Sequence, residues 1–97
     1  MSKAGKRLLS SARQALSFAE GAGTDGFAVH VPETVDIRAI RQREGLSQEQ
    51  FARRYGFALS ALRDWEQGRR QPDRAARLLL RVIEREPEAV SRALSAA

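Results

Sequence analysis

From Val35 to the end of the chain, apolar residues recur every three or four positions, which is the spacing of one face of an α-helix. Residues that cap or stop helices divide this region into five predicted helices. The first predicted helix is capped by Asp36 and ends at Gly45, and the second is capped by Ser47 with Gln50 and ends at Gly56. The third covers about Leu59–Gln67 and stops before Gly68. The fourth begins at Pro72–Asp73, and the fifth begins at Pro87.

The residues before this region show a different pattern. An apolar stripe at helical spacing predicts an amphipathic helix over residues 3–20, and the glycine-rich stretch 21–26 should end it. The stripe consists of Leu8, Ala12, Ala15, Leu16 and Ala19. Phe27, Val29 and Val31 then alternate with other residues, which predicts a short extended segment ended by Pro32. A lone strand has no ladder partner in this chain, so it would stay irregular, pair with a second copy, or pair with another protein. The sequence thus predicts an all-α protein, with an N-terminal arm (1–31) and a five-helix domain (32–97).

Composition excludes several classes of site. The chain has no cysteine and one histidine, so we expect no disulfide, no metal centre and no bound cofactor. Catalysis is not expected, because there is no nucleophile–histidine–acid set and no glycine-rich phosphate loop. No apolar run approaches the roughly 18 residues of a membrane helix. The basic start resembles a signal peptide, but Ser10, Ser11 and Arg13 break its apolar run, so we expect a cytoplasmic protein.

The charge balance favours an anionic partner. Seventeen Lys and Arg against twelve Asp and Glu give a net charge of +5 over 97 residues, and 15 of the 17 cations are arginine. The planar guanidinium binds phosphates and base edges bidentately, so this bias favours nucleic-acid binding. A solvated surface explains part of the same count, so composition alone does not decide the partner.

The stretch Leu46–Pro72 indicates the kind of anionic partner more directly than composition does. It is predicted to form a helix, a turn at Gly56, a second helix, and a basic segment after Gly68. This is the layout of a helix-turn-helix, whose second helix enters the major groove of DNA. Ala52 is small where the two helices should cross closely, and Gly56 suits the left-handed backbone of the turn.

At this point the sequence resembles the phage-repressor/Cro (XRE) helix-turn-helix family over residues 37–72. The match is carried by Arg41, Gly45–Glu49, Ala52, Gly56, Leu62, Trp65–Glu66, Gly68 and Pro72. The resemblance implies that Gln48 contacts a DNA phosphate, and that Arg41 and Glu66 form a structural ion pair between the first and third helices of the domain. Trp65 lies on the apolar face and is expected in the core.

The recognition helix itself has few hydrogen-bonding side chains. Leu59 can contact a thymine methyl, Ser60 can reach a base or a phosphate, and Arg63 is the best candidate for a guanine edge. Asp64 either accepts from a cytosine amino group or orients a nearby arginine. Direct readout therefore rests on few donors, and DNA shape is expected to add to it. Phosphate contacts are predicted from Gln48, Arg69, Arg70 and Arg74.

A narrower resemblance covers about residues 27–94. The runs His30–Arg41 and Trp65–Val90 look like those of small HigA-type antitoxins. This likeness implies a dimer that represses its own operon and a second partner, a RelE-like mRNA interferase toxin, which an N-terminal segment neutralises in some members. The implied toxin-binding residues are Leu8, Ala12, Leu16, Phe27, Val29 and Val31. The fourth and fifth helices have more apolar surface than a small core needs, so the predicted dimer interface is Leu79, Val82, Ile83, Val90 and Leu94.

Two alternatives stay open. The first is a stand-alone repressor of the same fold, whose arm serves dimerisation or DNA contact. The second concerns the predicted helix over residues 3–20, which could pack on its own domain or on the second copy of a dimer instead of binding a toxin.

Overall fold

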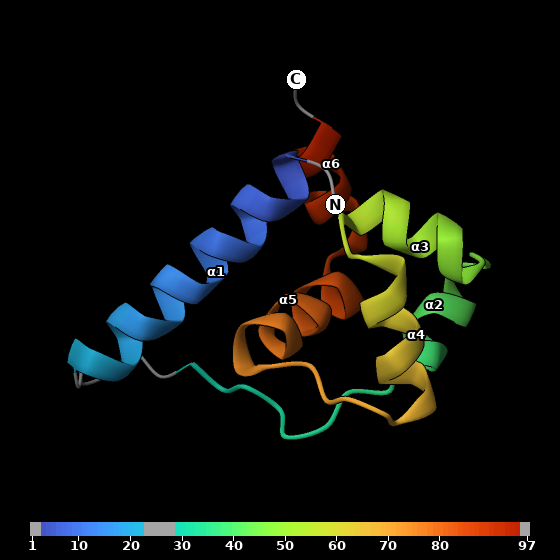
Figure 1. Ribbon diagram of the computed structural model, residues 1–97. Helices are drawn as coiled ribbons and strands as arrows, with labels where there is room; N and C mark the ends of the chain where they lie inside the picture. Colours follow the sequence, from blue (N-terminus) through green and yellow to red (C-terminus); the bar gives the residue numbers. More distant parts are fainter. Residues whose placement is uncertain (1–2, 23–28, 96–97) are drawn as a thin grey trace.

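The computed structural model describes residues 3–22 and 29–95, apart from the side chains of residues 3–4 and 18–22. Within these ranges the chain is entirely α-helical, which confirms the predicted class, and Figure 1 shows the arrangement. The helices are α1 (Lys3–Ala22), α2 (Ile37–Arg43), α3 (Gln48–Tyr55), α4 (Leu59–Gln67), α5 (Arg74–Arg85) and α6 (Pro87–Ser95).

The predicted capping residues set the helix starts. The Ser47 hydroxyl accepts from the Gln50 backbone N–H at 3.1 Å, and the Gln50 side chain accepts from the Ser47 N–H at 2.9 Å, so the capping box is complete. Asp36 caps α2 and Asp73 caps α5, each with a side-chain oxygen that accepts from a backbone N–H group in the first turn. Gly56 ends α3 with φ 76°, a left-handed conformation that other residues rarely adopt.

Helix α5 lies at the centre of the molecule and contacts α1, α2 and α6 (Figure 1). Its Leu80 and Ile83 are fully buried. On the other side of the core, Phe51 of α3 stacks near Phe57 and packs against Tyr55, with ring centroids 6.2 and 4.8 Å apart. Trp65 meets Phe57 edge-on at 5.5 Å, so it packs on the core as predicted, although it is only partly buried.

Helix α1 is not detached from the domain. It extends two residues beyond its predicted end, crosses α5 and reaches α6, and its Leu9 and Leu16 are buried (Figure 1). The open alternative in which this helix packs on its own domain is therefore the one observed. Leu9 was missing from the predicted apolar stripe, whereas Ala15, which was included, is exposed.

The packing of α1 covers much of the predicted dimer interface. Leu79, Ile83 and Val90 are at most 5% exposed and form part of the chain's own core, and Leu79 and Val90 also line a groove between α1, α5 and α6. Their apolar surface looked excessive in sequence because α1 was not counted as a layer of the domain. Val82 is 41% exposed, and Leu94 is partly buried against the core.

The described part of the lead-in segment is irregular. Residues 29–36 form no strand, and Val29 and Val31 are partly buried; Phe27 lies outside the described residues. Arg77 of α5 holds this segment in place. Its Nε donates to the Pro32 carbonyl at 2.8 Å and its Nη1 to the Pro72 carbonyl at 2.7 Å, so one side chain ties the lead-in to the loop after α4.

Among the described residues, no helix has the length and apolar character needed to span a membrane. The same ranges contain no group of three or more His, Cys, Asp or Glu side chains that could hold a metal ion.

Candidate nucleic-acid interface

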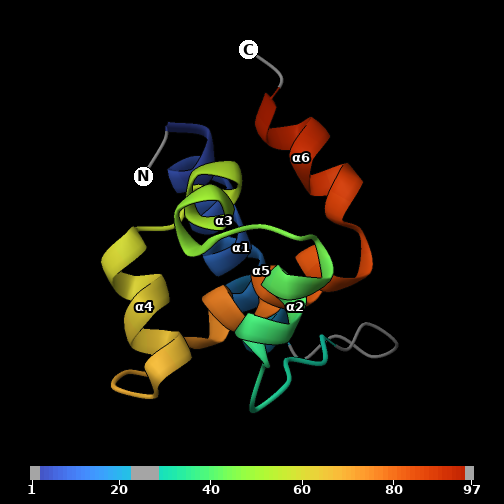
Figure 2. The same ribbon diagram turned by 90° about the vertical axis from the view of Figure 1, so that its right-hand side faces the viewer.

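Helices α3 and α4 form the helical pair of the candidate site. The turn Gly56–Ala58 joins them, and α4 lies at the side of the molecule opposite α6 (Figure 2). Ala52 is buried where α3 approaches α4, as its small size predicted. Leu62 of α4 is fully buried, so the opposite face of α4 points away from the core.

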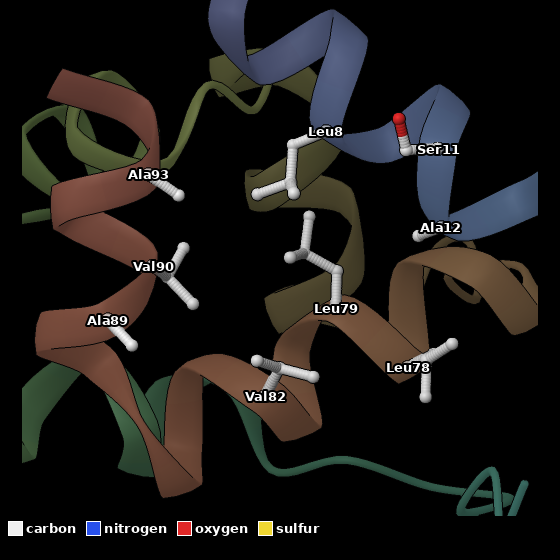
Figure 3. A pocket seen from close by; sticks show the side chains of 9 residues that line it. All are labelled: Leu8, Ser11, Ala12, Leu78, Leu79, Val82, Ala89, Val90 and Ala93. Carbon is white, nitrogen blue, oxygen red and sulfur yellow. The ribbon is translucent and has the colours of Figure 1, made fainter. Parts of the chain in front are cut away.

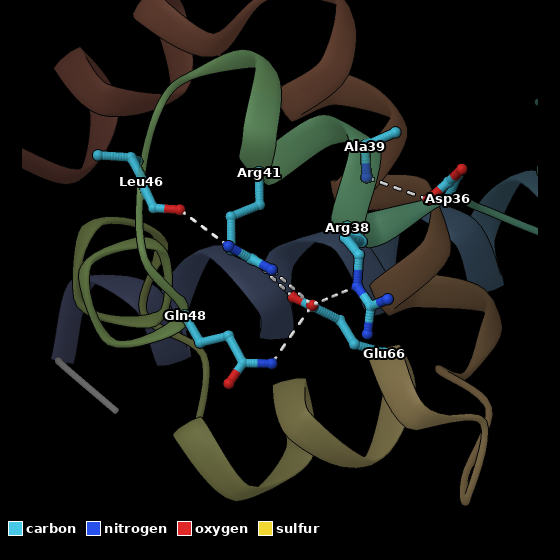
Figure 4. Close-up of polar contacts among 7 residues, drawn as sticks. All are labelled: Asp36, Arg38, Ala39, Arg41, Leu46, Gln48 and Glu66. Carbon is cyan, nitrogen blue, oxygen red and sulfur yellow. Dashed lines mark hydrogen bonds and ion pairs between the residues drawn. The ribbon is translucent and has the colours of Figure 1, made fainter.

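A buried carboxylate fixes α4 against α2. The Glu66 side chain is fully buried and accepts two hydrogen bonds from Arg41, from Nε to Oε2 and from Nη2 to Oε1, both at 2.9 Å (Figure 4). The Arg41 Nη1 also donates to the Leu46 carbonyl at 3.0 Å. The ion pair implied by the family resemblance is therefore present, and it joins α2, α4 and the loop before α3.

Two further donors complete this cluster, which we call the Glu66 cluster (Arg38, Arg41, Gln48 and Glu66). Gln48 Nε2 and Arg38 Nε reach Glu66 Oε1 at 3.3 and 3.4 Å. Burial alone would raise the pKa of the Glu66 carboxyl, but these hydrogen bonds, led by those of Arg41, outweigh it and lower the pKa. The bond to Glu66 in turn raises the pKa of Arg41. Both groups are therefore charged at neutral pH.

The side chain of Gln48, which was predicted to contact a phosphate, already has a partner within the protein. It is the first residue of α3 and partly buried, and its amide nitrogen is already bonded to Glu66 (Figure 4). The amide has a second N–H, which can donate to a phosphate while the bond to Glu66 is kept. The resemblance indicated the residue but not this intramolecular partner.

The exposed face of α4 contains two of the predicted base-contacting residues. Ser60 is exposed, and the Arg63 side chain is 48% exposed, with Nη2 3.9 Å from the Glu49 carboxylate of α3. Leu59 is partly buried against the core, which leaves less of it for a thymine methyl. Ala58 is exposed at the N-cap of α4 and offers no side-chain cap.

Asp64 faces the turn that follows α4 rather than standing free. Its Oδ1 accepts from Arg69 Nε at 3.0 Å, and its Oδ2 accepts from Arg70 Nε at 2.9 Å. These bonds, led by that of Arg69, lower the pKa of the carboxyl. The sequence left open whether Asp64 accepts from a base or orients an arginine, and the structure shows the second arrangement with two arginines.

The arginines of residues 69–81 differ in exposure and in partners. The three that were predicted to bind phosphate are exposed: Arg69 and Arg70 are about 60% exposed, and Arg74 is exposed in the first turn of α5. Arg77 donates to two backbone carbonyls, and Arg81 pairs with Glu84 at 2.8 Å.

Two members of the site were missed in the sequence. Arg38 lies three residues before Arg41, so both side chains share one face of α2 and reach Glu66. That spacing was a usable signal. Glu49, which approaches Arg63, is on a neighbouring helix, and only the fold brings the two together.

A second surface lies away from α4. An apolar groove of about 370 Å³, here called the α1–α5–α6 groove, has Leu8 of α1, Leu79 and Val82 of α5, and Val90 of α6 pointing into it (Figure 3). Its remaining lining residues are Ser11, Ala12, Leu78, Ala89 and Ala93. The groove thus combines residues predicted for toxin binding with residues predicted for dimerisation.

A helix-turn-helix family model matches residues 37–87, which is more than half of the chain. The chain belongs to this helix-turn-helix family. It is also 38% identical over 56 residues to antitoxin HigA-2 of Vibrio cholerae serotype O1, an alignment that covers 58% of this chain and 54% of that protein. The chain therefore spans about half the length of the relative that it matches. No solved structure matches it.

Within this helix-turn-helix domain, the matched range contains α2 to α5 and the first residue of α6. It therefore includes the Glu66 cluster, the exposed face of α4 and the arginines of the following turn. Helix α1 lies outside the match, although it is packed on the domain.

Proposed function

We propose that this chain is the DNA-binding antitoxin of a toxin–antitoxin pair, which binds the operator of its own operon as a dimer and neutralises a RelE-like mRNA interferase. The observation that carries the DNA-binding part is the surface formed by α4 and the turn after it, where Ser60, Arg63, Arg69 and Arg70 are all exposed. The partial likeness to a HigA antitoxin supports the choice of partner.

In this proposal α4 enters the major groove and Arg63 and Ser60 contact base edges. Arg69, Arg70 and Arg74 contact phosphates on the flanking backbone, and Gln48 contacts another at the start of α3. The Glu66 cluster supports this arrangement without touching DNA, because it fixes the angle between α2 and α4. Since Arg63 is the one cationic side chain on α4, DNA shape should supply part of the selectivity.

The dimer follows from the geometry of DNA recognition. One helix-turn-helix covers one half-site, and two copies bind a palindrome one or more helical turns apart. Of the five residues predicted for its interface, Leu79, Ile83 and Val90 are at most 5% exposed within one chain, and the interface surface stays a prediction.

We assign the α1–α5–α6 groove to the toxin. No charged residue lines it, it includes the exposed Val82, and three of its nine lining residues, Leu8 and Ala12 among them, come from α1. Leu16, also predicted to contact the toxin, is buried and instead holds α1 in place. An apolar side chain or helix of the partner that enters this groove would cover Val82.

DNA binding is tested with the fragment upstream of the gene. A fluorescently labelled duplex of that region should bind the chain at least about 10³-fold more tightly than a random duplex of equal length at physiological salt. Equal affinity for both duplexes would contradict the operator assignment.

Toxin binding is tested with Val82→Glu in the groove and Ala15→Glu as its control, because Ala15 is exposed on α1 and does not line the groove. Binding of the small basic protein encoded beside this gene should be lost in the first variant and kept in the second, with DNA binding intact in both. Deleting residues 1–31 is a poorer test, since it uncovers the core surface under Leu9 and Leu16. A Val82→Glu protein that still binds the toxin but no longer dimerises would identify the groove as the dimer interface.

A stand-alone repressor is the second candidate. The packing of α1 on α5 and α6 favours it, because a helix that belongs to the domain needs no toxin to order it. A neighbouring gene product that neither binds the chain nor arrests growth would decide for this candidate.

A further inference from the structure

Asp64 makes four hydrogen bonds to the two residues that follow α4 and its capping Gly68. Its backbone carbonyl accepts from the N–H groups of Arg69 and Arg70 at 2.9 and 3.4 Å. Its side-chain oxygens accept from the Nε atoms of the same two arginines at 3.0 and 2.9 Å. One residue of α4 therefore fixes both the backbone and the side chains of this turn.

The bonding leaves the outer edges of both guanidinium groups available. Each arginine uses Nε toward Asp64, and within the described residues no hydrogen bond from their terminal nitrogens is present. Both side chains are about 60% exposed, whereas that of Asp64 is 26% exposed. The paired terminal nitrogens of a guanidinium are the edge that binds a phosphate bidentately.

Asp64 also changes the charge that DNA meets. Two arginines contribute +2 to this turn, and the carboxylate reduces the sum to +1. Attraction to the DNA backbone is independent of sequence, so a lower local charge weakens binding to any duplex. Side chains held in one orientation can reach only phosphates that lie in register with α4, whereas mobile arginines reach phosphates in any register.

We infer that Asp64 is a specificity-determining residue that acts through Arg69 and Arg70 rather than by contacting a base. It lowers the affinity for random DNA and restricts the two arginines to the phosphates that flank a correctly seated α4. The inference rests on the proposed DNA-binding function of this surface.

A direct base contact by Asp64 is the competing explanation. To accept from a cytosine amino group, a carboxylate oxygen would have to share or release one of its two arginines. Such a contact would confine the effect of Asp64 to one base pair, which distinguishes it from an effect through phosphates.

The experiment compares Asp64→Asn with the wild-type chain on two duplexes, one selected by the wild-type protein from a randomised library and one of random sequence. Fluorescence anisotropy gives each affinity from 50 to 300 mM salt. Asp64→Glu keeps the charge, and Glu88→Gln removes an equal charge from α6, on the side of the molecule opposite α4 (Figure 2). Circular dichroism verifies the fold of each variant.

For Asp64→Asn we expect random-duplex affinity to rise about three- to eightfold at 0.1 M salt, because one more neutralised phosphate adds up to about 0.9 to the salt slope. The ratio of selected to random affinity should fall about three- to tenfold. Asp64→Glu and Glu88→Gln should each stay within about twofold of wild type on the random duplex.

Three results would overturn the inference. Random-duplex affinity could stay unchanged in Asp64→Asn, Glu88→Gln could produce the same rise, or Asp64→Asn could change the preference at one base pair with an unaltered salt slope. A wild-type chain that enriches no duplex from the randomised library would instead remove the proposed function, and the inference with it.

Discussion

Replacing Glu66 by glutamine should cost about 3 kcal/mol of unfolding free energy. The substitution preserves shape but removes the charge and turns an N–H₂ group toward the donors of Arg41. The Glu66 side chain is fully buried and the Arg41 side chain is 15% exposed, so water cannot replace the lost partner. Breaking a buried pair by removing one member costs roughly 3–5 kcal/mol. The lower end applies, because one acceptor oxygen remains and Arg41 keeps its bond to the Leu46 carbonyl.

The assay is urea denaturation followed by the fluorescence of Trp65, the single tryptophan, which is next to Glu66 in sequence. In a domain of this size a loss of 3 kcal/mol lowers Tm by on the order of 12–24 °C. Arg38→Ala is the matched control. Its side chain is 56% exposed and its bond is 3.4 Å long, so its removal should cost less than about 1 kcal/mol.

The charge of Glu66 also predicts a pH dependence. Its pKa is lower in the folded chain than in the unfolded chain, so the folded state binds fewer protons in the acid range. The stabilisation is therefore complete above the ordinary glutamate pKa and is lost as the pH falls through the lowered value. The difference between wild type and Glu66→Gln should shrink over that window. A loss below about 1 kcal/mol at neutral pH, or one equal to that of Arg38→Ala, would refute a buried pair that fixes α2 against α4.

Three further predictions concern other parts of the domain. Burial raises the pKa of Tyr55 to about 12, and its hydrogen bond to Glu44 at 2.6 Å adds to the shift, so absorbance at 295 nm should show this single tyrosine ionising only near pH 12. The stability of the fold should fall as the pH rises from the ordinary tyrosine pKa to that value. Ionisation of Tyr55 near the ordinary pKa would contradict its burial. Arg63→Ala should weaken binding to the selected duplex by about 1–3 kcal/mol and relax the base preference. Arg70→Ala should weaken binding to every duplex and flatten the salt dependence of the affinity by about one ion. Equal effects of the two variants on random DNA would argue against the division between base and phosphate contacts. Ser47→Ala removes half of the capping box and should cost about 1 kcal/mol in thermal unfolding, and no change in Tm would show that the cap of α3 contributes little.

The helix boundaries were largely predictable because their signals are local. Asp36, Ser47 and Asp73 cap the helices as predicted, and Gly56 and Gly68 adopt the left-handed conformation at helix ends. Each signal depends on a few neighbouring residues, so it can be recognised in sequence. The Arg41–Glu66 pair was available only through the family resemblance, since 25 residues separate its members.

The packing of α1 could not be obtained in the same way. Leu8, Leu9, Ala12 and Leu16 suit either a partner protein or α5, and periodicity does not say which surface covers them. Because α1 was not counted as a layer of the domain, Leu79 of α5 and Val90 of α6 had no predicted cover and were assigned to a dimer interface. The arginines after α4 could not be told apart from sequence either. Arg74 and Arg77 are the same residue type in the same basic stretch, but the fold directs Arg77 to the backbone carbonyls of Pro32 and Pro72.

The central claim is that α4 and the turn after it form the DNA-reading surface. Titrating the ¹⁵N-labelled chain with the duplex that it selects, and following its backbone amide resonances, tests this most directly. The account predicts the largest shifts at Gln48, at Ser60–Asp64 and at Arg69–Arg74, with little change at Leu8, Val82 and Val90 in the α1–α5–α6 groove. Shifts concentrated in α1 and α6, with α4 unchanged, would contradict it.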